Sequence, residues 1–296
     1  MNQKNVKPKY RVGGDTPSES IWPFLLLTFA IAGVSFAMML FDKDLHSPQG
    51  FPGLLVWLLA IWSPNLAILI LRLRSGGLFS FLKQAISAPA NPALLSLTLL
   101  PLVLLLALCQ ILPGIWPDFL TFPGLILLVG INLFMGPLGE EFGWRGFLYP
   151  ALRLRLGWLG AALLVGIIWG FWHAPLWFIE SPQSEIPFAV FLGNVMAFSV
   201  LMSILRDGTG PSLVGPILMH LSINVAAGLF GLLGMGSQAE YWTYSLLFMG
   251  GAAILALVVY QAGRNIVRME PTNRPLFRQV FAQWNQVPRR SDEGGL

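Results

Sequence analysis

The sequence predicts an all-α, polytopic membrane protein with about eight transmembrane helices. Of its 296 residues, 55% are hydrophobic and only 11% are charged, and the mean hydropathy is +0.67. Soluble domains usually carry about 25% charged residues. The chain also contains eight apolar runs of roughly membrane-spanning length. Nearly all of it is therefore expected to serve as spans and short connecting loops.

The elements follow in chain order. Segment 1–20 is polar and basic and is expected to be a flexible cytoplasmic arm, without a cleavable signal peptide, because the first apolar run has full spanning length. The apolar runs that each predict one span are residues 21–41, 51–71, 93–112, 122–152, 158–179, 186–205, 211–233 and 241–262. Together they form a transmembrane domain over residues 21–263. Residues 78–86 are short and amphipathic, which indicates an interfacial helix.

The tail 264–296 is polar and cytoplasmic in this prediction, and apolar side chains recur in it at helical spacing between residues 276 and 284, which predicts a helix on the membrane surface. Basic residues follow the even-numbered spans, whereas the opposite loops are acidic apart from Lys43. The positive-inside rule therefore places both termini in the cytoplasm. The short loops indicate a prokaryotic plasma membrane.

Two adjacent carboxylates and an arginine stand out within the fourth run, predicted as one long helix over residues 122–152. A charged side chain within the hydrocarbon costs at least about 3 kcal/mol, so a use for the group is expected. Glu141 and Arg145 are four residues apart with the acid first, which favours an ion pair on one helix face. Glu140 points about 100° away and is left free for chemistry or for a histidine. Gly139, Gly143 and Gly146 are expected to be packing glycines.

Two of the three histidines lie inside apolar runs. His173 precedes Pro175, which should loosen the helix there, and His220 and Asn224 are four apart and can face one cavity. Counted from basic anchors, Glu140 and His220 lie at matching depths of roughly 20 Å, whereas His173 lies deeper, at roughly 27 Å. The remaining histidine, His46, is expected to be only solvated. Cys109 is expected to be a small buried hydrophobe.

These residues resemble the CAAX protease and bacteriocin-processing family of intramembrane proteases. Glu140, Glu141 and Arg145 match its Glu-Glu-x-x-x-Arg motif, and His220 and Asn224 match its His-x-x-x-Asn motif. In the Phe-x-x-x-His motif, His173 fits, but Trp169 replaces the phenylalanine. That replacement is expected to affect packing more than chemistry. The resemblance covers about residues 120–230 and places a polar active site between spans four, five and seven.

The resemblance implies hydrolysis of a peptide bond within the membrane, in a peptide or in a prenylated CAAX-type substrate. Glu140 with His173 would activate a water as general base. His220 and Asn224 would donate hydrogen bonds to the oxyanion, roughly 3–4 kcal/mol per donor, and Glu141 paired with Arg145 would orient the site. No cofactor is expected. If the enzyme depended on zinc instead, the ligands would be Glu140, His173 and His220, although no His-Glu-x-x-His motif is present.

Other functions stay open at this point. A non-catalytic membrane scaffold or bacteriocin-immunity protein could keep the same pocket to bind a peptide. A proton-coupled transporter could use intramembrane glutamate and histidine as a relay, although the chain shows no clear inverted repeat. The expected partners are the lipid bilayer and a peptide or lipidated-peptide substrate. Nucleic acid is not expected, because the basic residues sit at the ends of apolar segments.

Overall fold

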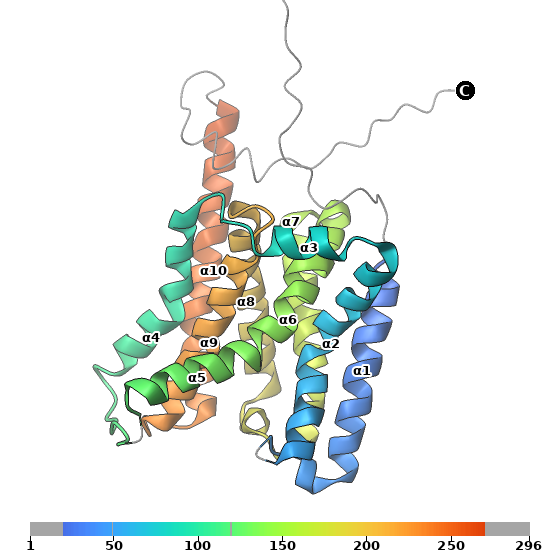
Figure 1. The fold of residues 1–296 in the computed structure, drawn as a ribbon. Helices are drawn as coiled ribbons and strands as arrows, with labels where there is room; N and C mark the ends of the chain where they lie inside the picture. The colour runs from blue at the N-terminus through green and yellow to red at the C-terminus, as the bar shows by residue number, and fades with distance from the viewer. Residues whose placement is uncertain (1–19, 49, 119, 270–296) are drawn as a thin grey trace, which may run out of the picture.

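The computed structural model describes residues 20–48, 50–118 and 120–269, and the regular structure in these segments is entirely helical (Figure 1). The α-helices are α1 (Ile21–Phe41), α2 (Phe51–Ser75), α3 (Leu78–Ala85), α4 (Leu100–Leu108), α5 (Phe122–Phe134), α6 (Pro137–Gly143), α7 (Tyr149–Trp172), α8 (Phe188–Gly208), α9 (Val214–Leu232) and α10 (Gln238–Met269). Most of them stand side by side, whereas α3 lies across one end of the bundle and α5 is strongly tilted. The predicted N-terminal arm and the predicted surface helix near residues 276–284 lie outside the described residues.

Six helical stretches in the described part of the chain are long and apolar enough to cross a membrane, and the protein is therefore a polytopic membrane protein. They are Ile21–Phe41, Phe51–Ser75, Phe122–Phe178, Phe188–Gly208, Val214–Leu232 and Gln238–Val259. The count is lower than the predicted eight for two reasons. The predicted fourth and fifth spans are merged into one 57-residue stretch, and the third predicted span is a shorter apolar helix.

The merged stretch reverses direction at Gly157. A straight helix of this length would measure about 85 Å, far more than the roughly 30 Å hydrocarbon core. Gly157 interrupts α7 with a positive φ of 71°, a conformation that glycine adopts without the steric cost of a Cβ. Residues on either side of it meet again, because Trp144 and Trp172 have ring centroids 6.0 Å apart. The chain thus forms an antiparallel helical pair around this glycine.

The prediction of one long helix over residues 122–152 is wrong. Helix α5 ends at Phe134, and Gly136 leaves helical geometry (φ −164°, ψ −92°) before Pro137 starts α6. After Gly143 the chain continues as a π-helix, η3 (Trp144–Leu148). Such π-turns are rare and often occur at functional sites. The breaks arise at glycine and proline, which weaken helical continuity.

The third predicted span, residues 93–112, is shorter than expected. It begins as a 3₁₀ helix, η2 (Pro92–Leu99), and becomes regular only in α4. Segment η2 starts at Pro92, and Pro101 is the second residue of α4; the fixed φ of proline suits the first helical turn. The α-helix then ends at Leu108, before the Pro113-Gly114 pair. The amphipathic prediction for residues 78–86 is confirmed as the short helix α3.

The bundle has two ends that differ in charge. At one end, called the basic end, α3 and the chain before α9 are joined by a hydrogen bond from the Leu213 N–H to the Ala85 carbonyl (2.7 Å). The basic end carries Arg72, Arg74, Lys83, Arg153, Arg155 and Arg206. At the opposite end, called the acidic end, the Glu180 N–H donates to His46 Nδ1 (3.4 Å). The acidic end carries Asp42, Asp44, Asp118, Glu180, Glu185 and Glu240, all exposed.

Two expectations for single residues are wrong. His46 is half-buried, and its Nε2 lies 2.8 Å from the Met39 carbonyl oxygen. It therefore joins two loops of the acidic end instead of being only solvated. Cys109 is exposed, since it follows the last residue of α4, and its Sγ lies 3.8 Å from the sulfur of Met235.

The three glycines around the acidic pair pack as expected. An added Cβ at Gly143 would lie 2.7 Å from the Pro64 carbonyl oxygen, and one at Gly139 would lie 2.9 Å from the Trp62 ring. At Gly146 it would lie 3.1 Å from Phe81. Glycine at these positions lets α6 and η3 approach α2 and α3 closely, because larger residues would hold the backbones apart. The acidic pair is thereby pressed into the interior of the bundle.

Candidate active site

Helix α6 holds the two carboxylates inside the bundle. Glu140 is 3% exposed and Glu141 is fully buried. Asn65 of α2 fixes this short helix, because its Oδ1 accepts from the Gly143 N–H (3.0 Å) and its Nδ2 donates to the Leu138 carbonyl. Sequence reasoning missed Asn65, although an asparagine inside the second apolar run was a visible signal.

Glu141 is the centre of a buried ionic cluster. Its Oε1 accepts from Arg145 Nη1 (3.1 Å), so the predicted pair four residues apart is confirmed. The same oxygen lies 2.8 Å from Nδ1 of His220, which comes from α9. The histidine thus meets Glu141, whereas the sequence had left Glu140 as the carboxylate free for chemistry or for a histidine. Buried ion pairs of this kind stay charged only when their partners compensate the desolvation.

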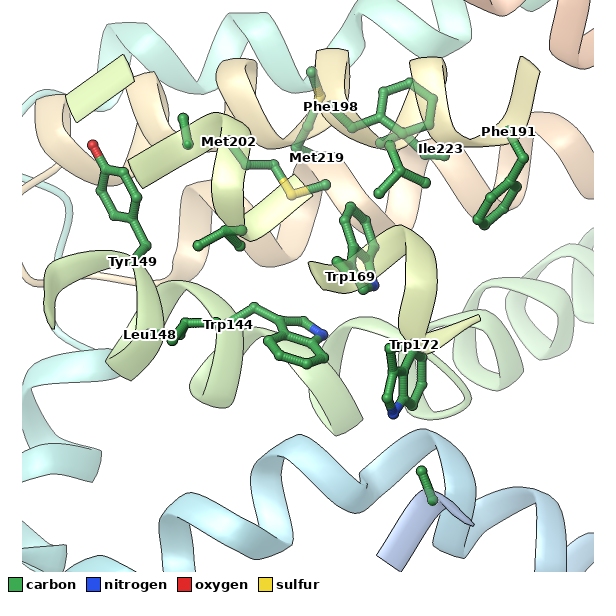
Figure 2. Close-up of a cluster of buried hydrophobic side chains, with 14 of the residues drawn as sticks. Trp144, Leu148, Tyr149, Trp169, Trp172, Phe191, Phe198, Met202, Met219 and Ile223 are labelled. Carbon is green, nitrogen blue, oxygen red and sulfur yellow. The ribbon is translucent and has the colours of Figure 1, made fainter. Parts of the chain in front are cut away.

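Glu140 is held by two tryptophans. Its Oε2 accepts a short hydrogen bond from Trp169 Nε1 (2.6 Å) and a longer one from Trp144 Nε1 (3.4 Å). Figure 2 shows Trp144 and Trp169 in the buried cluster on neighbouring stretches of chain. The expectation that tryptophan at position 169 affects packing more than chemistry is wrong, because a phenylalanine would have no N–H to donate.

Trp169 also connects the two carboxylates. The Arg145 guanidinium carbon lies 4.4 Å from the centroid of its ring, within cation–π range. The His220 ring centroid lies 5.2 Å from the centroid of the same indole. One indole therefore touches a residue of each family motif, and its position is fixed by the ionic cluster behind it.

His173 lies one helical turn beyond Trp169, at the C-terminal end of α7. The helix ends at Trp172 and is followed by a 3₁₀ helix, η4 (Ala174–Phe178), with Pro175 as its second residue, so the α-helix ends near this proline as expected. Nδ1 of His173 lies 2.8 Å from the Trp169 carbonyl oxygen. Since a carbonyl only accepts, Nδ1 carries the proton and Nε2 of the neutral ring is the acceptor.

Asn224 and His220 lie one turn apart on α9 and both approach the break before α6. A Cβ added at Gly136 would lie 2.6 Å from Asn224 Nδ2 and 3.6 Å from His220 Nε2. If Nδ1 of His220 donates to Glu141, Nε2 accepts in the neutral ring and donates only when the ring is doubly protonated. The amide of Asn224 can donate in either case.

Four of the six predicted site residues share one cavity of about 560 Å³. Glu140, His173, His220 and Asn224 line it, together with Trp169. Glu141 and Arg145 do not, and they therefore lie behind the cavity wall. Most of the other lining residues are apolar, with Asn132, Gln183 and Gln238 as polar additions. A cavity of this size with a few convergent polar groups is typical of a small-molecule or peptide site.

The described residues do not form a metal site. No group of three or more histidine, cysteine, aspartate or glutamate side chains in this part of the chain could hold a metal ion. The alternative ligand set of Glu140, His173 and His220 is divided by other bonds, because Glu140 accepts from tryptophans and His220 pairs with Glu141. The geometry of these three side chains therefore does not fit zinc.

Comparison with known proteins supports the motif assignment. Residues 122–226 match the family model described as type II CAAX prenyl endopeptidase Rce1-like. Over 123 residues the chain is 26% identical to CAAX prenyl protease 2 of Methanococcus maripaludis. That match covers 39% of this chain and 44% of the relative, so the chain aligns with less than half of the relative's length. The resemblance drawn from the three motifs is confirmed: residues 122–226, which include every motif residue from Glu140 to Asn224, match the Rce1-like type II CAAX prenyl endopeptidase (CPBP/Abi) family.

Proposed function

We propose that this protein is an intramembrane endopeptidase that hydrolyses a peptide bond of a peptide or prenylated CAAX-type substrate with a water activated by Glu140 and His173. The observation that carries the proposal is that Glu140, His173, His220 and Asn224, from three separate helical segments, line one cavity. Titratable groups that converge in a cleft are the arrangement expected of acid–base catalysis.

The chemistry follows from the two groups that can accept a proton. Trp169 occupies Oε2 of Glu140, which leaves Oε1 as the free acceptor. A water between Oε1 and Nε2 of His173 would give up a proton as its oxygen attacks the carbonyl carbon. The proton would then pass to the leaving amine as the peptide bond breaks.

The developing oxyanion needs hydrogen-bond donors. Asn224 lines the cavity, and its amide can supply one without any change of protonation. His220 supplies a second when its ring carries both protons. Each such donor contributes roughly 3–4 kcal/mol in acyl-transfer enzymes. Glu141 and Arg145 act from behind the wall as positioning residues.

The membrane arrangement belongs to the same proposal. We place eight spans in the bilayer, with the two halves of Phe122–Phe178 around Gly157 counted as two and Pro92–Leu108 as one. An even number of spans puts both termini on the same side of the membrane, and the basic residues assign that side to the cytoplasm. A prokaryotic plasma membrane fits the short loops.

The test is cleavage of a quenched-fluorescent peptide library by the purified, detergent-solubilised protein. Glu140→Ala and His173→Ala should each abolish cleavage. Cleavage by the wild type should be the same with and without a zinc chelator. Glu185→Ala serves as the matched control, because Glu185 is exposed and does not line the cavity. Its activity should equal that of the wild type.

Other outcomes separate the remaining functions. No cleavage by folded wild-type protein across a broad library would favour a peptide-binding scaffold. Equal cleavage by wild type and both variants would indicate a contaminating protease. Loss of activity in chelator alone would contradict the metal-free mechanism.

A further inference from the structure

The active-site cavity occupies only one half of the bundle. In α9, which runs away from the basic end, the lining begins at His220 and continues to Leu232, the last residue. In α8, which runs the other way, it is confined to the first half, from Phe191 to Phe198. Helix α2 contributes only Trp57, Ala60 and Ile61 from its first turns. Every one of these segments is the half of its helix nearest the acidic end.

The cavity also reaches the loops of the acidic end. Pro182 and Gln183, in the short 3₁₀ helix η5 (Pro182–Glu185) that precedes α8, line it, and so does Gln238 at the start of α10. Pro182 is exposed. No residue between Thr209 and Met219, the corresponding stretch at the basic end, lines the cavity. The lining therefore extends from Glu140 to one surface of the bundle and not to the other.

The charges of the two ends assign this surface to a side of the membrane. The basic end carries the arginines and Lys83, and the acidic end carries exposed carboxylates with Lys43 as its single basic side chain among the described residues. Lysine and arginine are retained on the cytoplasmic side of short loops. The surface that the cavity reaches is thus the non-cytoplasmic one.

The lining at this surface suits a peptide backbone. Gln183 and Gln238 each offer an amide donor and an amide acceptor, and Gln183 Oε1 is buried without a hydrogen-bond partner. Gln238 Nε2 makes one long bond, 3.4 Å, to the Ala227 carbonyl. No arginine, lysine or aspartate lines the cavity, and Glu140 is its one carboxylate. An uncharged lining between two amide side chains favours the binding of an extended, uncharged segment of a substrate peptide.

From this geometry we infer that substrate enters the active site from the non-cytoplasmic face, between Gln183 and Gln238, as an extended and uncharged stretch of peptide. The inference rests on the proposed peptidase activity for its substrate class, and on the cavity and the charges for its direction. Substrate entry from this face would distinguish the protein from an enzyme that cleaves the C-terminal tails of proteins presented in the cytoplasm.

The experiment measures access and hydrolysis separately. In a Cys109→Ala background, which removes the single cysteine, Gln183→Cys and Gln238→Cys are each treated with a membrane-impermeant, cationic methanethiosulfonate. Intact cells expose the outer face and inverted vesicles expose the cytoplasmic face. Lys83→Cys, exposed at the basic end, is the matched control. Both glutamine positions should react in intact cells, and position 83 should react in inverted vesicles. Reaction at 183 or 238 should abolish peptide hydrolysis.

Three results would overturn the inference. The cysteines at 183 and 238 could react only in inverted vesicles, could react from neither side, or could react from outside without any loss of hydrolysis. Failure of the proposed function would look different. The wild type would then cleave no peptide, while the labelling pattern would still report which face the cavity opens to.

Discussion

Replacing Arg145 by methionine should destabilise the protein strongly. Arg145 and Glu141 are both fully buried, and their bond measures 3.1 Å. The substitution leaves the Glu141 carboxylate buried with His220 as its one partner. Breaking one side of a buried pair costs about 3–5 kcal/mol, and the lost stacking on Trp169 adds about 1–2 kcal/mol. Arg145→Met should therefore lower the free energy of unfolding by about 4–7 kcal/mol.

The measurement is unfolding in mixed detergent and SDS micelles, followed by tryptophan fluorescence, as a double-mutant cycle. Glu141→Gln alone should also destabilise, because it leaves a buried guanidinium uncompensated. The double variant should recover at least about 1 kcal/mol relative to the sum of the singles, since no buried charge remains unpaired. Arg74→Met is the control for charge removal, because Arg74 is exposed at the basic end. The free energy of unfolding of Arg74→Met should stay within about 0.5 kcal/mol of that of the wild type.

One result would refute this reasoning. If the free energy of unfolding of Arg145→Met equals that of the wild type and of Arg74→Met, Arg145 does not hold Glu141 charged in the interior. Strict additivity in the cycle would carry the same meaning, because it would show that the two side chains do not interact.

Three further predictions concern the site and its support. Trp169→Phe keeps an aromatic ring but removes the 2.6 Å hydrogen bond to Glu140. Because a hydrogen bond to a charged group is worth about 1.5–3 kcal/mol, kcat should fall by about tenfold or more, whereas an unchanged kcat would mean that only the ring matters. Gly136→Ala should reduce kcat with little change in melting temperature, because its Cβ would displace the Asn224 amide, whereas Gly130→Ala, with nothing within 4 Å, should behave as wild type in the same peptide assay. Asn65→Leu should lower the free energy of unfolding by about 1–3 kcal/mol, since it leaves the buried Gly143 N–H unpaired; an unchanged SDS unfolding curve would argue against this clamp.

Local patterns in the sequence predicted much of the fold. Every apolar run became helix, and α3 appeared where amphipathic spacing indicated it. The pair of Glu141 and Arg145 was predictable because residues four apart on a helix are neighbours whatever the helix packs against. The only sequence signal for the breaks at Gly136 and Gly157 was the glycine itself, and glycine is also common inside intact membrane helices. The sequence therefore did not predict that the helices break at these two residues, because that depends on the residues packed around them.

The sequence by itself determined that this is a helical membrane protein and which polar residues would matter in it. Only the tertiary structure decided that His220 meets Glu141 and not Glu140, across 79 positions of chain. It also decided that Trp169 donates to Glu140 and that the cavity faces the acidic end. The physical reason is that helical periodicity fixes contacts only within one helix. Contacts between helices follow from their rotation and depth, which are set by close packing at glycines such as Gly143 and by buried polar clamps such as Asn65.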